Sequence, residues 1–254
     1  MTRALSWLAV FWRRIEVKLA WWFRRETPGA GPMGLKKKLI AERRTRWLDV
    51  GNGDRFEEGF EYLDWLVRTD IDPAIRSRCH QADILNLAEG EFASLGKFDL
   101  IRMQHVFEHF SLEEGPRVLA NCERLLSPGG VLLITVPDLD LFARAYLGHA
   151  FGLLKSFRGF AAGRIPPDAP GSYYFSVFAH SFGYSPEIEI AGSRAHRDQH
   201  KWCYDFTGLE HLLRKGGTFG DIRRIGLLHP LACIPFTHNR PEQDLCVMAR
   251  AKGA

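Results

Sequence analysis

The sequence predicts a doubly wound α/β domain, with a mostly parallel sheet between layers of helices, preceded by an amphipathic N-terminal helix. Short apolar runs alternate with helical patterns from Arg46 onward, and this alternation is typical of parallel strands joined by crossover helices. Glycines and acidic residues follow several of the apolar runs, at the positions where such sheets bind ligands. The first 27 residues instead place apolar side chains three and four residues apart, which is the spacing of one helix face.

Composition narrows the class of protein. The chain has 254 residues, of which 46% are hydrophobic and 25% are charged, and this suits one sizeable domain with an appendage. Its five cysteines are scattered and form no Cys-x-x-Cys pair, which argues against both a disulfide framework and a zinc ribbon. We therefore expect a protein of the reducing cytoplasm.

The positive charge is concentrated at the N-terminus. Residues 1–46 contain twelve Lys or Arg and three Glu, a net charge of +9, whereas the rest of the chain has 22 basic and 27 acidic residues, a net charge of −5. An anionic partner is therefore expected for the N-terminal segment alone.

An amphipathic basic helix is predicted over residues 1–27, followed by a linker over residues 28–45. The longest uncharged run, Ala4–Trp12, has nine residues against the roughly 20 needed to span a membrane, and Arg13-Arg14 would interrupt the apolar core of a signal peptide. Basic residues opposite Trp, Phe and Leu are typical of a helix lying on an anionic membrane surface. The alternative is a helix packed on protein; the tryptophans argue against a nucleic-acid arm. The predicted apolar face comprises Leu5, Leu8, Trp12, Ile15, Leu19 and Trp22.

Five apolar runs are predicted to be the first strands of the sheet. Val131–Val136 is rich in β-branched residues and has the character of a buried parallel strand, and the clearest helical pattern covers Glu113–Leu126. The other four predicted strands are Trp47–Val50, Leu66–Ile71, His80–Asp83 and Phe98–Met103.

A glycine turn follows the first predicted strand, in the segment LDVGNGD at residues 48–54. Gly51 and Gly53 permit a tight turn and a close approach of a ligand to the backbone. Asp70 is placed at the tip of the second predicted strand, where a carboxylate can accept hydrogen bonds from ribose hydroxyls, and Asp83 ends the third as a candidate for the adenine amine. Each residue alone is equally compatible with an ordinary turn, but together they indicate a nucleoside site.

The charge of this turn argues against a dinucleotide. A pyrophosphate favours the G-x-G-x-x-G spacing at a helix N-terminus, and Phe56 occupies the third glycine position. Asp54, Glu57, Glu58 and Glu61 surround it. These acids suit a ligand with ammonium and sulfonium charges and no phosphate, such as S-adenosylmethionine.

Together these segments resemble class I S-adenosylmethionine-dependent methyltransferases, especially a small bacterial group associated with cell-surface glycan genes. The resemblance covers about four-fifths of the chain and rests on LDVGNGD, TDIDP, FDLIRMQHVFEHFSLEEGPRVLANCERLLSPGGVLLITVPDLD and HKWCYDFTGLEHLLRKGG. It implies a Rossmann-like, seven-stranded sheet whose last two strands, Phe219–Ile225 and Asp244–Ala251, are antiparallel. The cofactor-binding residues that it implies are Asp49, Gly51, Asn52, Gly53, Asp70, Ile71, Asp83, Ile84, Gln104 and His105.

The pattern H-x-x-E-H at residues 105–109 also describes an inverted zinc-peptidase motif. That chemistry needs both histidines on one face of a helix, whereas the capping pattern Ser111-x-x-Glu114 indicates that the helix begins only after the motif. We therefore predict no metal site.

A hydroxyl acceptor needs its proton removed by a base. The preferred candidates for this base are His105 and Asp138, and the other candidates are Glu108, His109 and His200.

An aromatic segment at about residues 141–199 interrupts the alternation and is predicted to form a lid over the reaction end of the sheet. With this insert, the methyltransferase domain is expected to span residues 46–252.

We expect the enzyme to methylate a small-molecule, glycan or lipid-linked acceptor and to have no nucleic-acid partner. The enzyme itself is expected either free in the cytoplasm or peripherally attached to the inner membrane face. A non-catalytic binding or scaffold protein and a nicotinamide-dependent oxidoreductase are the alternatives.

Overall fold

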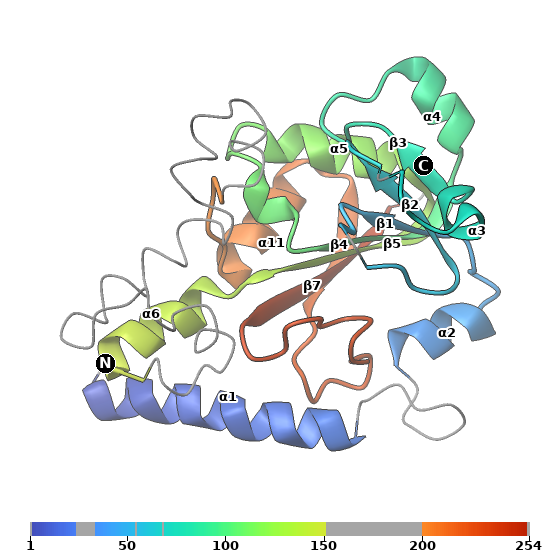
Figure 1. Ribbon diagram of the computed structural model, residues 1–254. Helices are drawn as coiled ribbons and strands as arrows, with labels where there is room; N and C mark the ends of the chain where they lie inside the picture. The colour runs from blue at the N-terminus through green and yellow to red at the C-terminus, as the bar shows by residue number, and fades with distance from the viewer. Residues whose placement is uncertain (1, 24–33, 54, 68, 151–199, 253–254) are drawn as a thin grey trace.

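The molecule is built around a seven-stranded sheet with the strand order β3-β2-β1-β4-β5-β7-β6 (Figure 1). This computed structural model describes residues 2–23, 34–53, 55–67, 69–150 and 200–252. Strands β1 to β5 pair in parallel, and β7 runs antiparallel to both β5 and β6. The predicted fold class is confirmed, including the antiparallel pairing of the last two strands.

The elements follow one another in the expected α/β order. The strands are β1 (Trp47–Val50), β2 (Phe60–Asp64), β3 (Cys79–Gln81), β4 (Phe98–Gln104), β5 (Leu126–Pro137), β6 (Phe219–Arg224) and β7 (Asp244–Ala251). The helices are α1 (Arg3–Phe23), α2 (Leu35–Ala41), α3 (Pro73–Arg76), α4 (Glu89–Leu95), the 3₁₀ turn η1 (Phe107–His109), α5 (Gly115–Leu125), α6 (Leu139–Gly148) and α11 (Phe206–Lys215). The predicted insert therefore begins with α6, and its residues 151–199 lie outside the described part of the chain.

Apolar side chains cover both faces of the sheet. Alternate residues of β4 and β5 point to opposite faces, so Ile101 and Leu132 belong to one cluster while Leu100 and Val131 belong to the other. The first cluster is closed by α4, α5 and α11, and the second by α2 and the segment before β7. The sheet is thus buried on both sides, as expected for parallel strands.

The second strand lies earlier in the sequence than predicted. It covers Phe60–Asp64, and the predicted Leu66–Ile71 forms no strand among its described residues. Phe60 and Tyr62 are buried against one face of the sheet and Leu63 against the other, whereas Leu66 is 42% exposed. The prediction was wrong because the acidic residues before and within FEYLD resemble those of a solvated turn.

The link from β1 to β2 is unusually short for a parallel pair. Parallel strands ordinarily need a crossover of a dozen or more residues, most often a helix, but only residues 51–59 separate these two strands, and none of the described ones is helical. The Tyr62 hydroxyl hydrogen-bonds the backbone of Glu57, and the Phe56 ring packs edge-on against Tyr62 at 5.1 Å. These contacts hold the link against the sheet without a helix.

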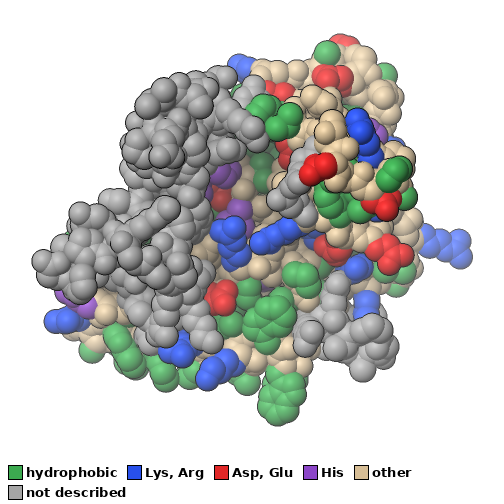
Figure 2. All heavy atoms as spheres, in the orientation of Figure 1, with side chains coloured by type: hydrophobic (Ala, Val, Ile, Leu, Met, Phe, Trp, Pro, Cys, Tyr) green, Lys and Arg blue, Asp and Glu red, His purple; other side chains and the backbone are tan. Residues whose placement is uncertain are grey.

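The N-terminal helix packs on the domain with a face that was not predicted. The buried residues of α1 are Ser6, Val10, Arg13, Val17 and Ala20, and they contact α6 and the segment before β7. The predicted apolar face is largely exposed, with Leu5 and Trp12 each at 55%, and Figure 2 shows hydrophobic side chains along the lower edge of the molecule, over α1. None of the described helices is long and apolar enough to cross a membrane.

Part of the predicted linker is also structured. Residues 35–41 form α2, and both Leu35 and Leu39 are completely buried. A single helical turn separates these leucines, but the lysines between them gave this stretch the appearance of a solvated connector.

Candidate functional site

A cavity of about 440 Å³ opens at the carboxyl ends of the first strands. Parallel α/β sheets bind ligands at this edge, so its position agrees with the sequence prediction. Its walls combine apolar and ionisable side chains. The lining residues are Val50, Gly51, Gly53, Leu63, Asp64, Trp65, Ala82, Asp83, Ile84, Leu85, Asn86, His105, Val106, His109, Phe110, Glu114 and Lys201.

The glycine turn after β1 exposes its backbone to this cavity. Gly51 and Gly53 have φ angles of +67° and +57°, a region that side-chain-bearing residues rarely adopt. A Cβ on Gly51 would lie 2.6 Å from Cγ2 of Val106, whereas one on Gly53 would meet nothing within 4 Å. Gly51 therefore allows close packing of the turn on the loop after β4, and Gly53 leaves open space beside the backbone.

Two carboxylates stand at the strand ends that line the cavity. Asp64 ends β2, and its Oδ1 accepts a hydrogen bond of 3.2 Å from the Leu66 amide. Asp83 follows β3, and its two oxygens accept hydrogen bonds from Leu85 N at 3.0 Å and from Asn86 Nδ2 at 3.1 Å. These bonds orient both carboxylates at the cavity wall.

Asp70 does not occupy the predicted position. It lies on an exposed bend six residues beyond the end of β2 and is not a lining residue of the cavity. Its neighbour Ile71 instead borders a small adjoining hollow, together with Asn52. Because the strand was placed too late in the sequence, the acid at its tip is Asp64 rather than Asp70.

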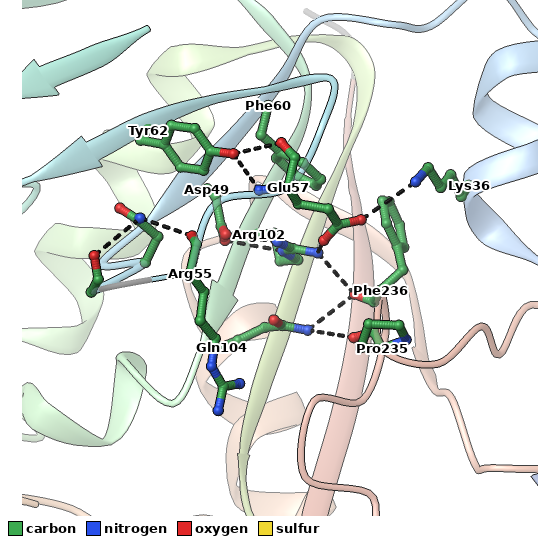
Figure 3. Close-up of polar contacts among 12 residues, drawn as sticks. Lys36, Asp49, Arg55, Glu57, Phe60, Tyr62, Arg102, Gln104, Pro235 and Phe236 are labelled. Atoms are coloured by element: carbon green, nitrogen blue, oxygen red, sulfur yellow. Dashed lines mark hydrogen bonds and ion pairs between the residues drawn. The ribbon is translucent and has the colours of Figure 1, made fainter. Parts of the chain in front are cut away.

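Three further predicted residues direct their side chains elsewhere, and two of them, Asp49 and Gln104, are labelled in Figure 3. Asp49 is buried and forms a two-bond ion pair with Arg102, at 2.7 and 3.0 Å. The amide of Asn52 donates to the backbone oxygen of Arg55 at 2.9 Å. The amide of Gln104 donates to two backbone oxygens of the segment before β7, each at 3.1 Å. None of the three lines the cavity, so within the described residues their contribution is to hold the surrounding chain.

His105 reaches the cavity wall but carries a charge. Its Nε2 lies 2.8 Å from Oδ1 of Asp244, and its Nδ1 lies 3.3 Å from Oε1 of Glu108. Burial lowers the pKa of His105, but the charge and hydrogen bond of Asp244, together with the contact to Glu108, outweigh it and raise the pKa to about 9. At neutral pH the ring is therefore an imidazolium, which donates a hydrogen bond to Asp244 and is unsuited to act as a base.

Asp138 is a buried structural acid in the described part of the chain. It precedes α6, is 2% exposed, and its Oδ2 accepts a 2.6 Å hydrogen bond from Arg224. Burial raises its pKa, while the charges of Arg224 and Arg13 oppose the rise. It does not line the cavity, because the chain turns into α6 directly after β5 and this side chain pairs with Arg224 of β6.

The remaining catalytic candidates meet at one place. Glu108, His109 and His200 bring one potential ligand atom each to within 4.8 Å of the others, and His109 lines the cavity. Lys201, which was not predicted from the sequence, also lines the cavity, and its ammonium pairs with Glu114 at 3.0 Å. No local pattern could have revealed this pair, because its members lie 87 residues apart.

Comparison with known proteins gives one family and several distant folds. A family model described as a methyltransferase domain matches residues 23–217. The chain is 33% identical over 102 residues to chemotaxis protein methyltransferase 1 of Pseudomonas aeruginosa, a match covering 40% of this chain and 32% of that protein. The chain thus matches only about a third of the length of this curated relative.

The solved structures that it resembles share little sequence with it. A Burkholderia thailandensis 1,6-didemethyltoxoflavin-N1-methyltransferase, solved with 1,6-didemethyltoxoflavin and S-adenosylhomocysteine, is 14% identical with a TM-score of 0.45, covering 84% of this chain and 74% of that one. An S-adenosylmethionine-dependent methyltransferase from Clostridium acetobutylicum is 13% identical with a TM-score of 0.44, covering 86% and 89%.

Proposed function

The chain belongs to the methyltransferase domain family, as a class I S-adenosylmethionine-dependent methyltransferase, and from this premise we propose that the cavity beside Gly51 and Gly53 holds the cofactor. The exposed backbone of the glycine turn is the observation that carries the proposal. At Gly53 any side chain would enter space that a ligand can otherwise occupy.

The chemistry of the lining residues supports this placement. Asp64 lies at the end of β2, one strand away from the glycine turn, where a carboxylate can accept both ribose hydroxyls. Asp83 and the buried Ile84 lie at the next strand end and suit the adenine edge and face. The acidic lining is compatible with a sulfonium and an ammonium group, and unfavourable for a pyrophosphate.

Methyl transfer from this cofactor needs alignment more than acid–base chemistry. The acceptor lone pair forms a bond to the methyl carbon while the C–S bond breaks and its electrons stay on sulfur, so a protein that holds the two partners in line supplies much of the rate. His105, fixed between Asp244 and Glu108, would position groups at the cavity wall as a charged donor.

Calorimetric titration with S-adenosylmethionine tests the cofactor site. Asp64→Ala should weaken binding by about 10- to 100-fold, because hydrogen bonds to a charged group contribute about 1.5–3 kcal/mol. Asp70→Ala is the matched control, since it removes the same group from the exposed bend, and it should leave the affinity unchanged.

Three outcomes would contradict this assignment. Weakening by Asp70→Ala but not by Asp64→Ala would return the ribose role to Asp70. Binding of NAD in place of S-adenosylmethionine would favour an oxidoreductase. The absence of binding to S-adenosylmethionine and S-adenosylhomocysteine alike would favour a scaffold protein.

We further infer that α1 attaches the enzyme to an anionic membrane surface without leaving the domain. Its outer face is mostly exposed and strongly apolar: Trp22 is 79% exposed, and Leu8 and Phe23 are 52% and 54% exposed. A soluble surface rarely presents so many large apolar side chains in one place.

The charge around this face favours a lipid partner. Arg3 and Lys18 are exposed on the same helix, and the +9 charge of residues 1–46 contrasts with the acidic remainder. Aromatic side chains combined with Lys and Arg are the composition of helices in a membrane interface. An acceptor that resides at the surface, such as a lipid-linked glycan, would then be presented to the enzyme.

Sedimentation with vesicles containing about one-fifth phosphatidylglycerol tests this attachment. Deletion of α1 would uncover buried Val10 and Val17, so a surface variant is better. Trp12→Gln/Trp22→Gln should reduce vesicle binding by at least about tenfold, because burial of each indole at the interface is lost. Leu66→Gln changes an apolar residue that is 42% exposed and lies outside α1, and it should bind like the parent; equal binding by all three proteins would contradict the inference.

A further inference from the structure

Glu108 is a buried carboxylate without an ordinary hydrogen-bond partner in the described part of the chain. It is 1% exposed, and neither of its oxygens accepts a hydrogen bond of normal geometry from a described residue. Nδ1 of His105 lies 3.3 Å and Nε2 of His200 lies 3.8 Å from its Oε1, and the second distance is too long for a hydrogen bond. Buried acceptors in this condition commonly indicate an ion or a water molecule.

Two imidazoles complete a ligand set around this carboxylate. The ligand atoms of Glu108, His109 and His200 all lie within 4.8 Å of one another, and the two rings face each other edge-on with centroids 5.1 Å apart. A point between three such atoms lies at most about 2.8 Å from each, so movements of about 0.7 Å would bring them to the roughly 2.1 Å of a zinc site.

The backbone holds this arrangement in place. The carbonyl oxygen of Glu108 accepts hydrogen bonds from the amides of Lys201 at 2.8 Å and Trp202 at 3.2 Å. These bonds hold Lys201 and Trp202, which follow His200, against η1. The ion pair between Lys201 and Glu114 adds to this contact. The cluster is therefore built by two segments about 90 residues apart that the fold brings together.

We propose that Glu108, His109 and His200 bind a divalent transition-metal ion of the zinc class at the wall of the cofactor cavity, where it takes the oxygen of a hydroxylated methyl acceptor as a further ligand. One carboxylate and two imidazoles form a ligand set that leaves coordination positions open. His109 lines the cavity, so an open position can face the acceptor. The proposal rests on the methyltransferase function proposed above and names its acceptor class.

The ion would activate the hydroxyl group of the acceptor. It would lower the pKa of the bound hydroxyl, whose proton leaves to solvent. The oxygen lone pair would then form the C–O bond as the C–S bond breaks, and the electron pair of that bond would stay on sulfur in S-adenosylhomocysteine. No metal site was predicted from the sequence because His105 and His109 share no helical face; in the proposed site the second imidazole comes from His200 instead.

Metal binding by the full chain, after removal of metals with a chelator, tests the site directly. Titration with Zn²⁺ in a calorimeter should show one equivalent bound, and Co²⁺ should develop the visible absorption of a tetrahedral or five-coordinate site. His200→Ala and Glu108→Gln should each raise the Zn²⁺ dissociation constant at least about 100-fold, with unchanged far-ultraviolet circular dichroism. His211→Ala removes an exposed imidazole on α11 and should bind like the parent.

The outcome is separable from that of the cofactor site. Asp64→Ala should bind Zn²⁺ normally while losing cofactor affinity, and His200→Ala should show the reverse. Failure to bind one equivalent, or binding that persists in His200→Ala and in His109→Gln, would overturn the metal site while leaving the cofactor assignment intact. If Glu108→Gln does not fold, the two histidine variants still decide the question.

Discussion

Loss of Arg102 should destabilise the protein more than loss of any surface charge. Its guanidinium makes two bonds to Asp49 on the adjacent strand, at register-matched positions of β1 and β4. The two side chains are only 3% and 5% exposed. The guanidinium carbon also lies 4.0 Å from the centre of the Phe60 ring. The ion pair is therefore packed against the apolar cluster that contains Phe60 and Phe236 (Figure 3).

The expected magnitude follows from this burial. Arg102→Met leaves the Asp49 carboxylate buried without its partner, and removal of one member of a buried ion pair costs about 3–5 kcal/mol. Glu57 also loses a 2.7 Å contact, but it is 24% exposed and keeps Lys36 at 3.4 Å, so its share is small. Arg102→Lys keeps the charge without the two-bond geometry and should fall between.

Urea unfolding monitored by circular dichroism measures these differences. The double variant Asp49→Val/Arg102→Met removes both charges and should recover most of the stability lost in Arg102→Met, because an apolar pair of similar size needs no desolvation. A loss below about 1 kcal/mol in Arg102→Met, or no recovery in the double variant, would refute the claim that this ion pair acts as a buried unit.

Three further predictions concern other parts of the molecule. Gly51→Ala should weaken S-adenosylmethionine binding and lower the unfolding free energy by about 1–3 kcal/mol, because its Cβ would lie 2.6 Å from Val106 at a φ of +67°; an unchanged calorimetric affinity would contradict this. Burial lowers the pKa of His238 to about 4, below its value of about 6.5 in the unfolded chain. The buried neutral ring therefore contributes about 3 kcal/mol of stability above pH ~6.5, and this contribution is lost as the pH falls to about 4. In urea titrations at about pH 7 and pH 4.5, His238→Gln should lose less stability than the parent, and equal losses would count against this origin. Arg13→Met removes hydrogen bonds to two buried backbone carbonyls near the start of β7 and should cost about 2 kcal/mol, visible as a lower melting temperature; an unchanged melting temperature would show that α1 does not depend on this contact.

Strands β1, β4 and β5 were predictable because apolar residues dominate each run and each is followed by a recognisable turn or loop. The second strand was not, although FEYLD alternates correctly, because acidic residues before and within it resembled a solvated turn. Its misplacement had a direct consequence for the site, since it moved the candidate ribose ligand from Asp64 to Asp70.

Helix α1 gives a second example of what the sequence could not predict, namely which face of a helix is buried. The three- and four-residue spacing predicted a helix correctly, and two stripes on it satisfy that spacing. The stripe through Val10, Arg13 and Val17 is buried, whereas the more apolar stripe through Leu8 and Trp12 is exposed. Hydrophobicity alone would have predicted that the other face is buried. The observed face is buried because it packs on α6 and because Arg13 donates hydrogen bonds to the backbone oxygens of Pro241 and Asp244.

The sequence by itself determined the fold class, the glycine turn and the family, because these depend on local periodicity and on residues close together in the chain. The tertiary structure alone decided which acid reaches the cavity, that Asp244 raises the pKa of His105, and that His200 lies beside Glu108 and His109. Each of these rests on contacts between segments far apart in sequence, and the energies of such contacts depend on distance and burial, which no local pattern encodes.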